Sequence, residues 1–320
     1  MKTLLKQLSL GDRITDYFVC AVKNLRIDKN GNKFLQLRLT DAGGNIGAVM
    51  WDVSDSVAES FAQGDVVKVQ GTVTTDHRGQ PQIKLERIRA AGADDDFDLA
   101  SLLPASARPL AEMQTELAEI RENVKDPDLR SLLDEIFADP AVYQAFCDSP
   151  AAKGFHHNYI HGLLEHSVSV CRVAGAIAAE YTHDINSDLL ITGAILHDIG
   201  KTIEFEYKAL INYSDSGRLL GHIILGEKMV SEAINRVEGF PPALGLQLLH
   251  LIISHHGEYE YGSPRRPKTL EAFVLHHADD IDAKANVFQR LRAETEGTGA
   301  SWSEYNRVLE RFLYLKKPGD

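Results

Sequence analysis

The chain has 320 residues, of which 44% are hydrophobic and 25% charged, a composition typical of a folded protein with about two domains. No apolar run reaches the ~20 residues that span a bilayer, and Lys6 interrupts the N-terminal stretch that a signal peptide would need. Three widely spaced cysteines without a CxxC pair fit reduced thiols: Cys20, Cys147 and Cys171. We therefore expect a cytoplasmic protein that does not associate with membranes.

Charge is distributed unevenly along the chain. The net charge of −12 excludes a protein that is basic throughout and binds nucleic acid by charge alone. Residues 1–92 nevertheless contain 13 lysines and arginines against 10 aspartates and glutamates, whereas the remainder contains 21 against 36. A basic surface is therefore compatible with the first part of the chain, and a carboxylate-rich metal site with the second.

Residues 13–90 are predicted to form the short strands of a small all-β barrel. In residues 34–40, leucines at every second position define one face, and Phe34 and Arg38 lie on the other. Asn-Gly and Gly-Gly pairs mark hairpin turns. Further strands are expected at 45–52, 65–75 and 81–89, and a single helix at 56–63. Three strands, a helix and two strands is the order of an OB-fold, with another small barrel or sandwich as the alternative.

A linker is predicted at residues 93–109, between a first domain at 1–92 and a second at 110–320. It contains an acidic run and two prolines, which interrupt the strand pattern. Beyond it the sequence is helical, and we expect an all-α bundle. The predicted helices are 110–124, 128–137, 140–146, 162–181, 188–196 and one that begins near Thr269.

The second domain concentrates histidine and aspartate at helix boundaries. Imidazoles and carboxylates without thiolates suit Mn, Fe, Co, Ni or Zn in a hydrolytic site. In an adjacent His-Asp pair, one carboxylate oxygen can bind the same metal ion as the neighbouring histidine, and the other oxygen can bridge to a second ion. Two ions ~3.5–4 Å apart can drive a phosphoryl displacement. The ordered set is His166, His197, Asp198, His222, His255, His256 and Asp279, with Lys201 placed to neutralise charge on a phosphate.

Each of these residues also has an ordinary structural interpretation. A lone histidine is usually a surface or core residue, and a His-Asp pair alone is a weak signal. His277 lies on an apolar stripe and is expected to pack, while Asp280 and Asp282 are expected to be solvated or to support the ligands. Lys201 alone would be an ordinary cation at a helix C-terminus. The ordered combination is what predicts a metal centre.

Several longer segments extend this set: PAAKGFHH at 150–157, GLLEHS at 162–167, HDIGKT at 197–202, LGHI at 220–223, LIISHHG at 251–257, GSPRRPKTLEA at 262–272 and residues 279–284. Together they resemble the YhaM family of 3′-to-5′ exoribonucleases within the HD phosphohydrolase superfamily, whose members place an OB-fold before the HD domain. One departure is His161, where the family pattern leads us to expect glycine.

The resemblance implies a ligand set. The first metal site would use His166, His197, Asp198 and Asp279, and the second would use Asp198 as a bridge with His222, His255 and His256. Asp198 and Lys201 would be the catalytic residues. Manganese is the expected ion, with iron, cobalt or nickel as alternatives and one or two ions per chain.

The resemblance also implies the substrate, single-stranded RNA or also DNA, shortened from its 3′ end to nucleoside 5′-monophosphates. His156 and His157 would line the substrate pocket, and Phe34, Arg38, Lys33 and Arg78 would contact the strand on the barrel. Trp51 could stack on bases or fill the barrel. Two alternatives stay open: an HD enzyme acting on nucleotides or cyclic dinucleotides, and a non-catalytic single-strand-binding factor. A homo-oligomer is compatible with all three.

Overall fold

The computed structural model separates into two compact units, described here in turn. The first, the barrel unit, comprises Met1–Ala105 and Tyr207–Ile211, and the second, the helical unit, comprises Ser106–Glu206 and Asn212–Asp320. The structure describes residues 4–76, 79–92, 94–97, 102–153, 157–207, 211–295, 300–306 and 309–316.

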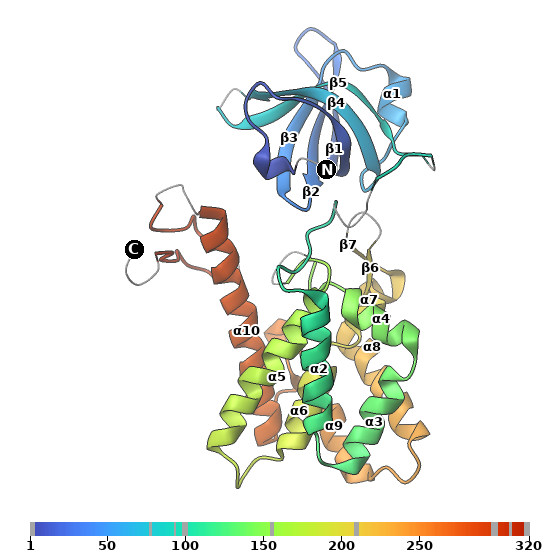
Figure 1. Ribbon diagram of the computed structural model, residues 1–320, viewed down its shortest axis with the longest axis vertical. Coiled ribbons are helices and arrows are strands. Elements are labelled where there is room, and N and C mark those ends of the chain that lie inside the picture. Colours follow the sequence, from blue (N-terminus) through green and yellow to red (C-terminus); the bar gives the residue numbers. More distant parts are fainter. Residues whose placement is uncertain are drawn as a thin grey trace. The chain divides into compact units, whose positions relative to one another are not determined.

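The barrel unit is a closed five-stranded barrel with the strand order β1-β2-β3-β5-β4 (Figure 1). Only β3 and β5 pair in parallel among the described residues; the other neighbours are antiparallel. This arrangement confirms the predicted OB-fold. Its elements are η1 (Leu5–Gln7), β1 (Arg13–Ile27), β2 (Lys33–Asp41), β3 (Gly44–Met50), α1 (Asp55–Glu59), β4 (Val66–Thr75) and β5 (Pro81–Ala90).

Strand β1 closes the barrel and is longer than the short strands that we expected. Its first half pairs with β4 and its second half with β2, and a register shift between Cys20 and Val22 lies on the β2 side. Such a bulge bends a strand and increases its twist, which allows one strand to pair on both sides of a small barrel. The alternating leucines of β2 point into the core and are buried, as predicted: Leu35, Leu37 and Leu39.

The helical unit contains helices α2 to α10 and confirms the predicted helical bundle. Two short paired strands, β6 and β7, belong partly to it, while Tyr207 and Ile211 at their adjoining ends belong to the barrel unit. Aspartates that precede Pro127 and Pro140 accept hydrogen bonds from the first backbone amides of α3 and α4, which fixes where these helices begin. The bounds are α2 (Leu110–Asn123), α3 (Pro127–Phe137), α4 (Pro140–Asp148), α5 (Gly162–Glu180), α6 (Ser187–Leu196), α7 (Lys201–Glu204), β6 (Phe205–Tyr207), β7 (Ile211–Tyr213), α8 (Asp215–Arg236), α9 (Pro242–Ser254), η3 (Tyr259–Tyr261) and α10 (Leu270–Thr295).

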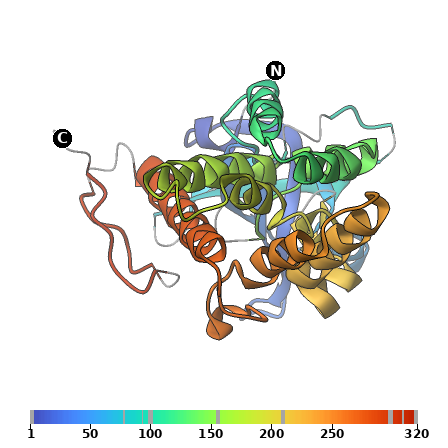
Figure 2. The ribbon, with the colours of Figure 1, turned by 90° about the horizontal axis from the view of Figure 1, so that it is seen from below.

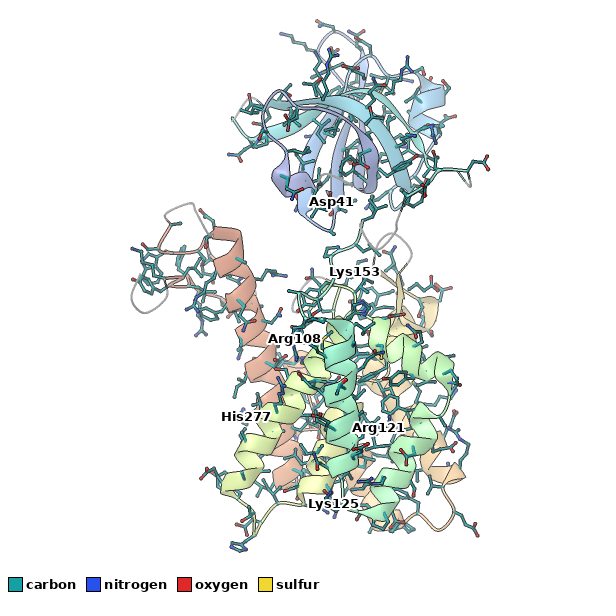
Figure 3. The ribbon with its side chains drawn as sticks, viewed as in Figure 1. Asp41, Arg108, Arg121, Lys125, Lys153 and His277 are labelled. Atoms are coloured by element: carbon teal, nitrogen blue, oxygen red, sulfur yellow. The ribbon has the colours of Figure 1, made fainter. Side chains whose placement is uncertain are left out.

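Helices α5 and α6 form the buried centre of the helical unit. Most of the residues of α6 are buried, and α10 packs against both helices, as Figure 2 shows for α10 (red) beside α5 (yellow-green). The buried face of α10 includes Val274 and Ala278, so His277, labelled in Figure 3, is exposed beside Phe273. Our expectation that His277 packs in the core was therefore wrong.

Helix α8 is broken at Gly221, whose φ of 73° and ψ of 159° lie outside the helical region. An L-residue with a side chain rarely adopts this conformation, whereas glycine does so without strain. His222 consequently begins a second helical segment, where the sequence predicted a helix start. In the described part of the chain, the helices are too short or too polar to cross a membrane.

Candidate metal centre

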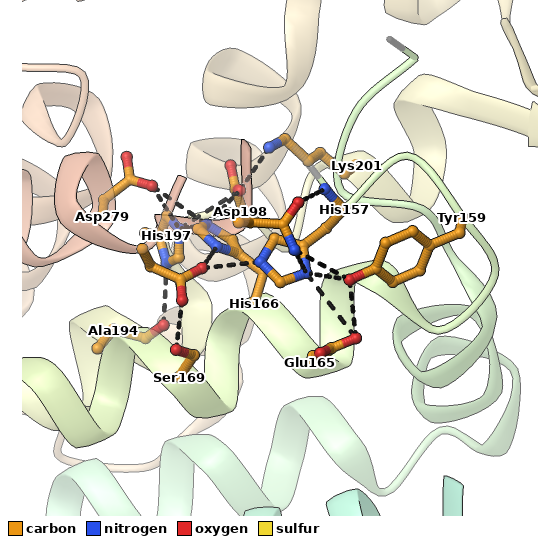
Figure 4. Close-up of polar contacts among 12 residues, drawn as sticks. His157, Tyr159, Glu165, His166, Ser169, Ala194, His197, Asp198, Lys201 and Asp279 are labelled. Carbon is orange, nitrogen blue, oxygen red and sulfur yellow. Dashed lines mark hydrogen bonds and ion pairs between the residues drawn. The ribbon is translucent and has the colours of Figure 1, made fainter. Parts of the chain in front are cut away.

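All seven predicted metal ligands meet at one centre in the helical unit. They come from different helices or from the residues that follow them, and Figure 4 shows four of them directed at one another. His166, His197 and His255 have no exposed surface, and Asp198 is 1% exposed. The origins are α5 for His166, the end of α6 for His197 and Asp198, α8 for His222, the end of α9 for His255 and His256, and α10 for Asp279.

The first group of ligands surrounds one oxygen of Asp198. The Nε2 atoms of His166 and His197 are 3.2 Å apart, and His166 Nε2 is 3.1 Å from Asp279 Oδ1. Asp198 Oδ2 lies 3.5 Å from His166 Nε2 and 3.3 Å from His197 Nε2. Four donor atoms therefore converge on a space of the size that a single cation requires.

The second group surrounds the other oxygen of the same carboxylate. Asp198 Oδ1 lies 3.4 Å from His222 Nε2 and 3.6 Å from His255 Nε2. The ring of His256 is 4.5 Å from that of His255 and 5.1 Å from that of His222, measured between centroids. Within the described residues, Asp198 Oδ1, His222 Nε2 and His255 Nε2 are buried atoms without a hydrogen-bond partner. Such unpaired atoms are costly unless a ligand satisfies them.

Each histidine is oriented by a bond from its other ring nitrogen. Because backbone carbonyls and carboxylates can only accept, these bonds place the proton on Nδ1 and leave Nε2 to face the centre. The acceptors are Asp282 Oδ2 for His166 (2.7 Å), Ala194 O for His197 (2.9 Å), Glu204 Oε1 for His222 (3.2 Å), Ile252 O for His255 (2.6 Å) and Tyr261 O for His256 (2.8 Å).

The unprotonated Nε2 atoms of the histidines face one another at the centre, so a proton or a cation is needed between them. Burial acts to lower the pKa of His166, but hydrogen bonds to Asp279 and Asp282 raise it to about 9, so a proton occupies this position when no metal does. Burial lowers the pKa of His256 to about 3, together with the neighbouring His255 and His222. The pKa of Asp198 lies well below its usual range because Lys201 and His197 outweigh the effect of burial. Nitrogen and oxygen donors without thiolate fit divalent Mn, Fe, Co, Ni or Zn.

Lys201 lies against the Asp198 carboxylate, with its Nζ atom 2.5 Å from Asp198 Oδ2. The preceding Gly200 allows α7 to approach α8, because a Cβ atom there would be 2.0 Å from the carbonyl oxygen of His222. A cavity of about 530 Å³ adjoins the centre, and Lys201, His222, His256 and Asp279 form part of its wall.

Two carboxylates support the ligands: Asp282, for which the sequence left this role open beside simple solvation, and Glu204, which the sequence did not single out. Asp282 is 8% exposed and accepts hydrogen bonds from His166 Nδ1, from His157 Nε2 at 2.9 Å and from Ser169 Oγ. Glu204 accepts from both the backbone amide and Nδ1 of His222. Asp282 lies one helical turn after Asp279, and that spacing is the signal that could have placed it on the ligand face.

His157 lies elsewhere than expected. It is 3% exposed, bonds to Asp282, and through Nδ1 contacts the Tyr159 hydroxyl at 2.8 Å, which in turn donates to Glu165. His157 therefore stands behind His166 and not on the cavity wall, so the predicted substrate contact does not fit its position. His156 lies outside the described residues.

His161, the departure from the family pattern, adopts the left-handed region with a φ of 67°. Glycine takes this conformation without the strain that a side chain adds. The imidazole compensates locally, because its Nδ1 atom lies 2.9 Å from the carbonyl oxygen of Cys147 and 3.5 Å from Asp148 Oδ1. His161 contacts none of the seven predicted ligands through these atoms.

The barrel residues predicted to contact nucleic acid lie on β2 and beside it. Phe34 stacks on Trp51 with a centroid distance of 4.7 Å, and Trp51 is 49% exposed. The alternative that Trp51 fills the interior of the barrel is therefore excluded. Arg38 is exposed and donates to Asn45 Oδ1 at 3.1 Å, while Lys33 forms an ion pair with Asp55. Arg78 lies outside the described residues.

Two protein-family models match parts of this chain. A family model of the HD domain matches residues 163–284, and one of an OB-fold nucleic acid binding domain matches residues 19–91. Fold and site together define a metal-dependent HD-type hydrolase joined to a nucleic-acid-binding OB-fold.

The particular family follows from two relatives named 3′-5′ exoribonuclease YhaM. The chain is 35% identical over 281 residues to the protein of Bacillus velezensis and 34% identical to that of Bacillus subtilis, with 88% of this chain and 88% of each relative covered. The chain belongs to the YhaM family, as the sequence motifs indicated. An OB-fold domain of replication protein A from Methanococcus maripaludis is 19% identical and covers 31% of this chain and 100% of that domain, with a TM-score of 0.24.

The carboxylate of Asp282 can be tested as a support of the first site. Asp282→Asn removes the charge that holds His166 Nδ1, and we expect affinity for Mn²⁺ to fall by about ten- to a hundredfold. Calorimetric titration with Mn²⁺ measures this. Asp280→Asn is the matched control, because Asp280 lies on the same helix but pairs with Lys284 at 2.6 Å. Equal affinity in both variants would contradict the role of Asp282.

Metal binding to the first site is expected to weaken as the pH falls. Because the pKa of His166 is raised to about 9, the first ion has to displace one proton, and the apparent affinity should fall about tenfold per pH unit below that value. In the metal-free protein, the same shift stabilises the fold fully below pH 6.5 and progressively less as the pH rises through about 9. Calorimetry in buffers of different ionisation enthalpy counts the protons released. Binding without proton release near neutral pH would refute this assignment.

Proposed function

We propose that this chain is a metal-dependent 3′-to-5′ exoribonuclease that shortens single-stranded RNA and releases nucleoside 5′-monophosphates. The observation that carries the proposal is the carboxylate of Asp198, whose two oxygens serve two separate groups of histidines. Family membership supplies the reaction class, since both relatives are named 3′-5′ exoribonucleases.

The ligand roles form part of the proposal. His166, His197 and Asp279 would hold one divalent ion with Asp198 Oδ2, and His222, His255 and His256 would hold a second with Asp198 Oδ1. Bound ions supply Lewis-acid activation of water and of the phosphate. Manganese is our first choice because the resemblance to the family implies it, and the imidazole and carboxylate donors fit iron, cobalt and nickel as well.

Lys201 contributes charge on the cavity side of the centre. Its ammonium group pairs with Asp198 and lines the cavity, where it can also approach a phosphate oxygen. A positioned cation of this kind favours the state in which negative charge develops on the phosphate and the leaving oxygen. We therefore assign Lys201 a catalytic role and Asp198 the bridging role.

The barrel unit would bind the strand without selecting its sequence. The Phe34–Trp51 stack offers an aromatic surface to bases, and Arg38 and Lys33 offer cations to the backbone. This chemistry accepts single-stranded RNA and DNA alike, so DNA is included as a second ligand.

Location and assembly are two further parts of the proposal. A cytoplasmic location is supported by three buried free thiols. Assembly into a homo-oligomer is supported by exposed apolar residues on α10, namely Leu270, Phe273 and Ile281.

Activity is tested with RNA labelled at its 5′ end, in the presence of Mn²⁺. The wild-type protein should produce a ladder that shortens from the 3′ end. His197→Gln and Asp198→Asn should reduce the rate more than about a hundredfold because each removes a metal ligand. His183→Gln, a change at an exposed histidine, is the control. Binding without shortening would indicate a non-catalytic factor, and turnover of mononucleotides alone a nucleotide hydrolase.

The role of the barrel is tested by Phe34→Ala and Trp51→Ala. Because stacking of one base is worth ~1–3 kcal/mol, affinity for long RNA should fall about tenfold, while turnover of a short oligonucleotide is spared. Trp51→Phe keeps an aromatic ring and should retain most of the affinity. Leu10→Ala, at a 62% exposed position of the same unit, controls for surface effects. A similar loss on long and short RNA would refute this role for the barrel.

A further inference from the structure

The cavity beside the metal centre contains three lysines in its described lining. Its volume is about 530 Å³, and Lys153, Lys201 and Lys284 lie in its wall together with the aromatic residues Tyr213 and Tyr261. This volume lies in the range of sites that hold one small ligand, such as a single nucleotide. The lysines differ in what neutralises them, and that difference indicates a function for one of them.

Lys201 and Lys284 are both paired with carboxylates. Lys201 Nζ is 2.5 Å from Asp198 Oδ2, and Lys284 Nζ is 2.6 Å from Asp280 Oδ2. Each of these two lysines thus has a neighbouring carboxylate that compensates its charge.

Lys153 has neutral partners instead. Its Nζ atom donates to Asn212 Oδ1 at 3.3 Å and lies 5.4 Å from the centre of the Tyr213 ring. In the part of the chain that the structure describes, no carboxylate forms an ion pair with it. An amide oxygen and a ring face hold an ammonium group in place without cancelling its charge. Figure 3 shows Lys153 at the end of the helical unit opposite to Lys125.

An uncompensated cation in this wall has a specific electrostatic role. Residues 93–320 contain 21 lysines and arginines against 36 aspartates and glutamates, so the surrounding unit repels a polyanion in general. Bound divalent ions would in turn repel a lysine beside them. A phosphate group between the ions and the lysine would be attracted by both. An anionic ligand therefore fits this part of the cavity.

We propose that Lys153 binds the RNA phosphate on the 5′ side of the linkage that is cleaved. This inference rests on the proposed function. In a 3′-to-5′ enzyme the scissile phosphate lies at the metal centre, and the terminal nucleotide ends in a hydroxyl group that offers no further phosphate. The next phosphate along the strand is therefore on the 5′ side. Lys153 is a substrate-positioning residue, and its contact is independent of base identity.

The first measurement compares Lys153→Ala with wild type and with Lys125→Ala, an exposed lysine that lines no part of this cavity. Lys153→Ala should raise KM about five- to tenfold for every sequence, leave kcat and Mn²⁺ affinity unchanged, and reduce the slope of log KM against log salt concentration by about 0.7. Lys153→Arg should restore most of the loss. Lys125→Ala should behave as wild type.

The second measurement locates the phosphate. A single methylphosphonate, which is uncharged, is placed at the linkage 5′ of the scissile one or one linkage further away. We expect the nearer substitution to raise KM for wild type and to have almost no effect on Lys153→Ala. Equal sensitivity of both proteins to the nearer substitution, or an unchanged salt slope in Lys153→Ala, would overturn the proposal. Failure of the wild-type protein to shorten RNA would instead refute the proposed function.

Discussion

The helical unit depends on one buried carboxylate whose two oxygens face two groups of histidines. Asp198 is 1% exposed, so its charge has to be matched inside the protein or it would destabilise the fold. Two groups of imidazoles and the ammonium group of Lys201 surround it. Four features of the helical unit bring these side chains to the same carboxylate: the ends of α6 and α9, the break in α8 and one face of α10.

Helix ends are suited to this task for a reason that the structure makes concrete. The last carbonyls of a helix lack partners within it. Nδ1 of His197 donates to the carbonyl of Ala194, and Nδ1 of His255 donates to that of Ile252, each three residues earlier. One imidazole thus satisfies a terminal carbonyl of its own helix and, with the opposite nitrogen, faces the centre. Each of these two histidines is thus oriented by a bond within its own helix end and not by a contact with a distant segment.

This local geometry explains what could be predicted from the sequence. The fold class followed from strand order and helical periodicity, and the seven side chains that meet at the centre followed from motifs at helix boundaries. Contacts between distant segments could not be predicted: Asp282 joins α10 to His157 and His166, and Glu204 accepts a hydrogen bond from His222, 18 residues further along the chain. The buried position of His157 depends on those contacts, because its motif alone is equally compatible with a place on the cavity wall.

The spread of the ligands along the chain has a consequence for folding. Side chains spread over positions 166–279 have to be assembled to complete the first group, and over positions 198–256 to complete the second, so a preformed site does not exist in the unfolded chain. An ion that binds only the assembled state acts as a reversible crosslink between sequence-distant helices, adding about 2.7 kcal/mol of stability at a concentration a hundred times its dissociation constant. Cellular supply of the metal would then determine how long the chain survives proteolysis as well as how fast it works.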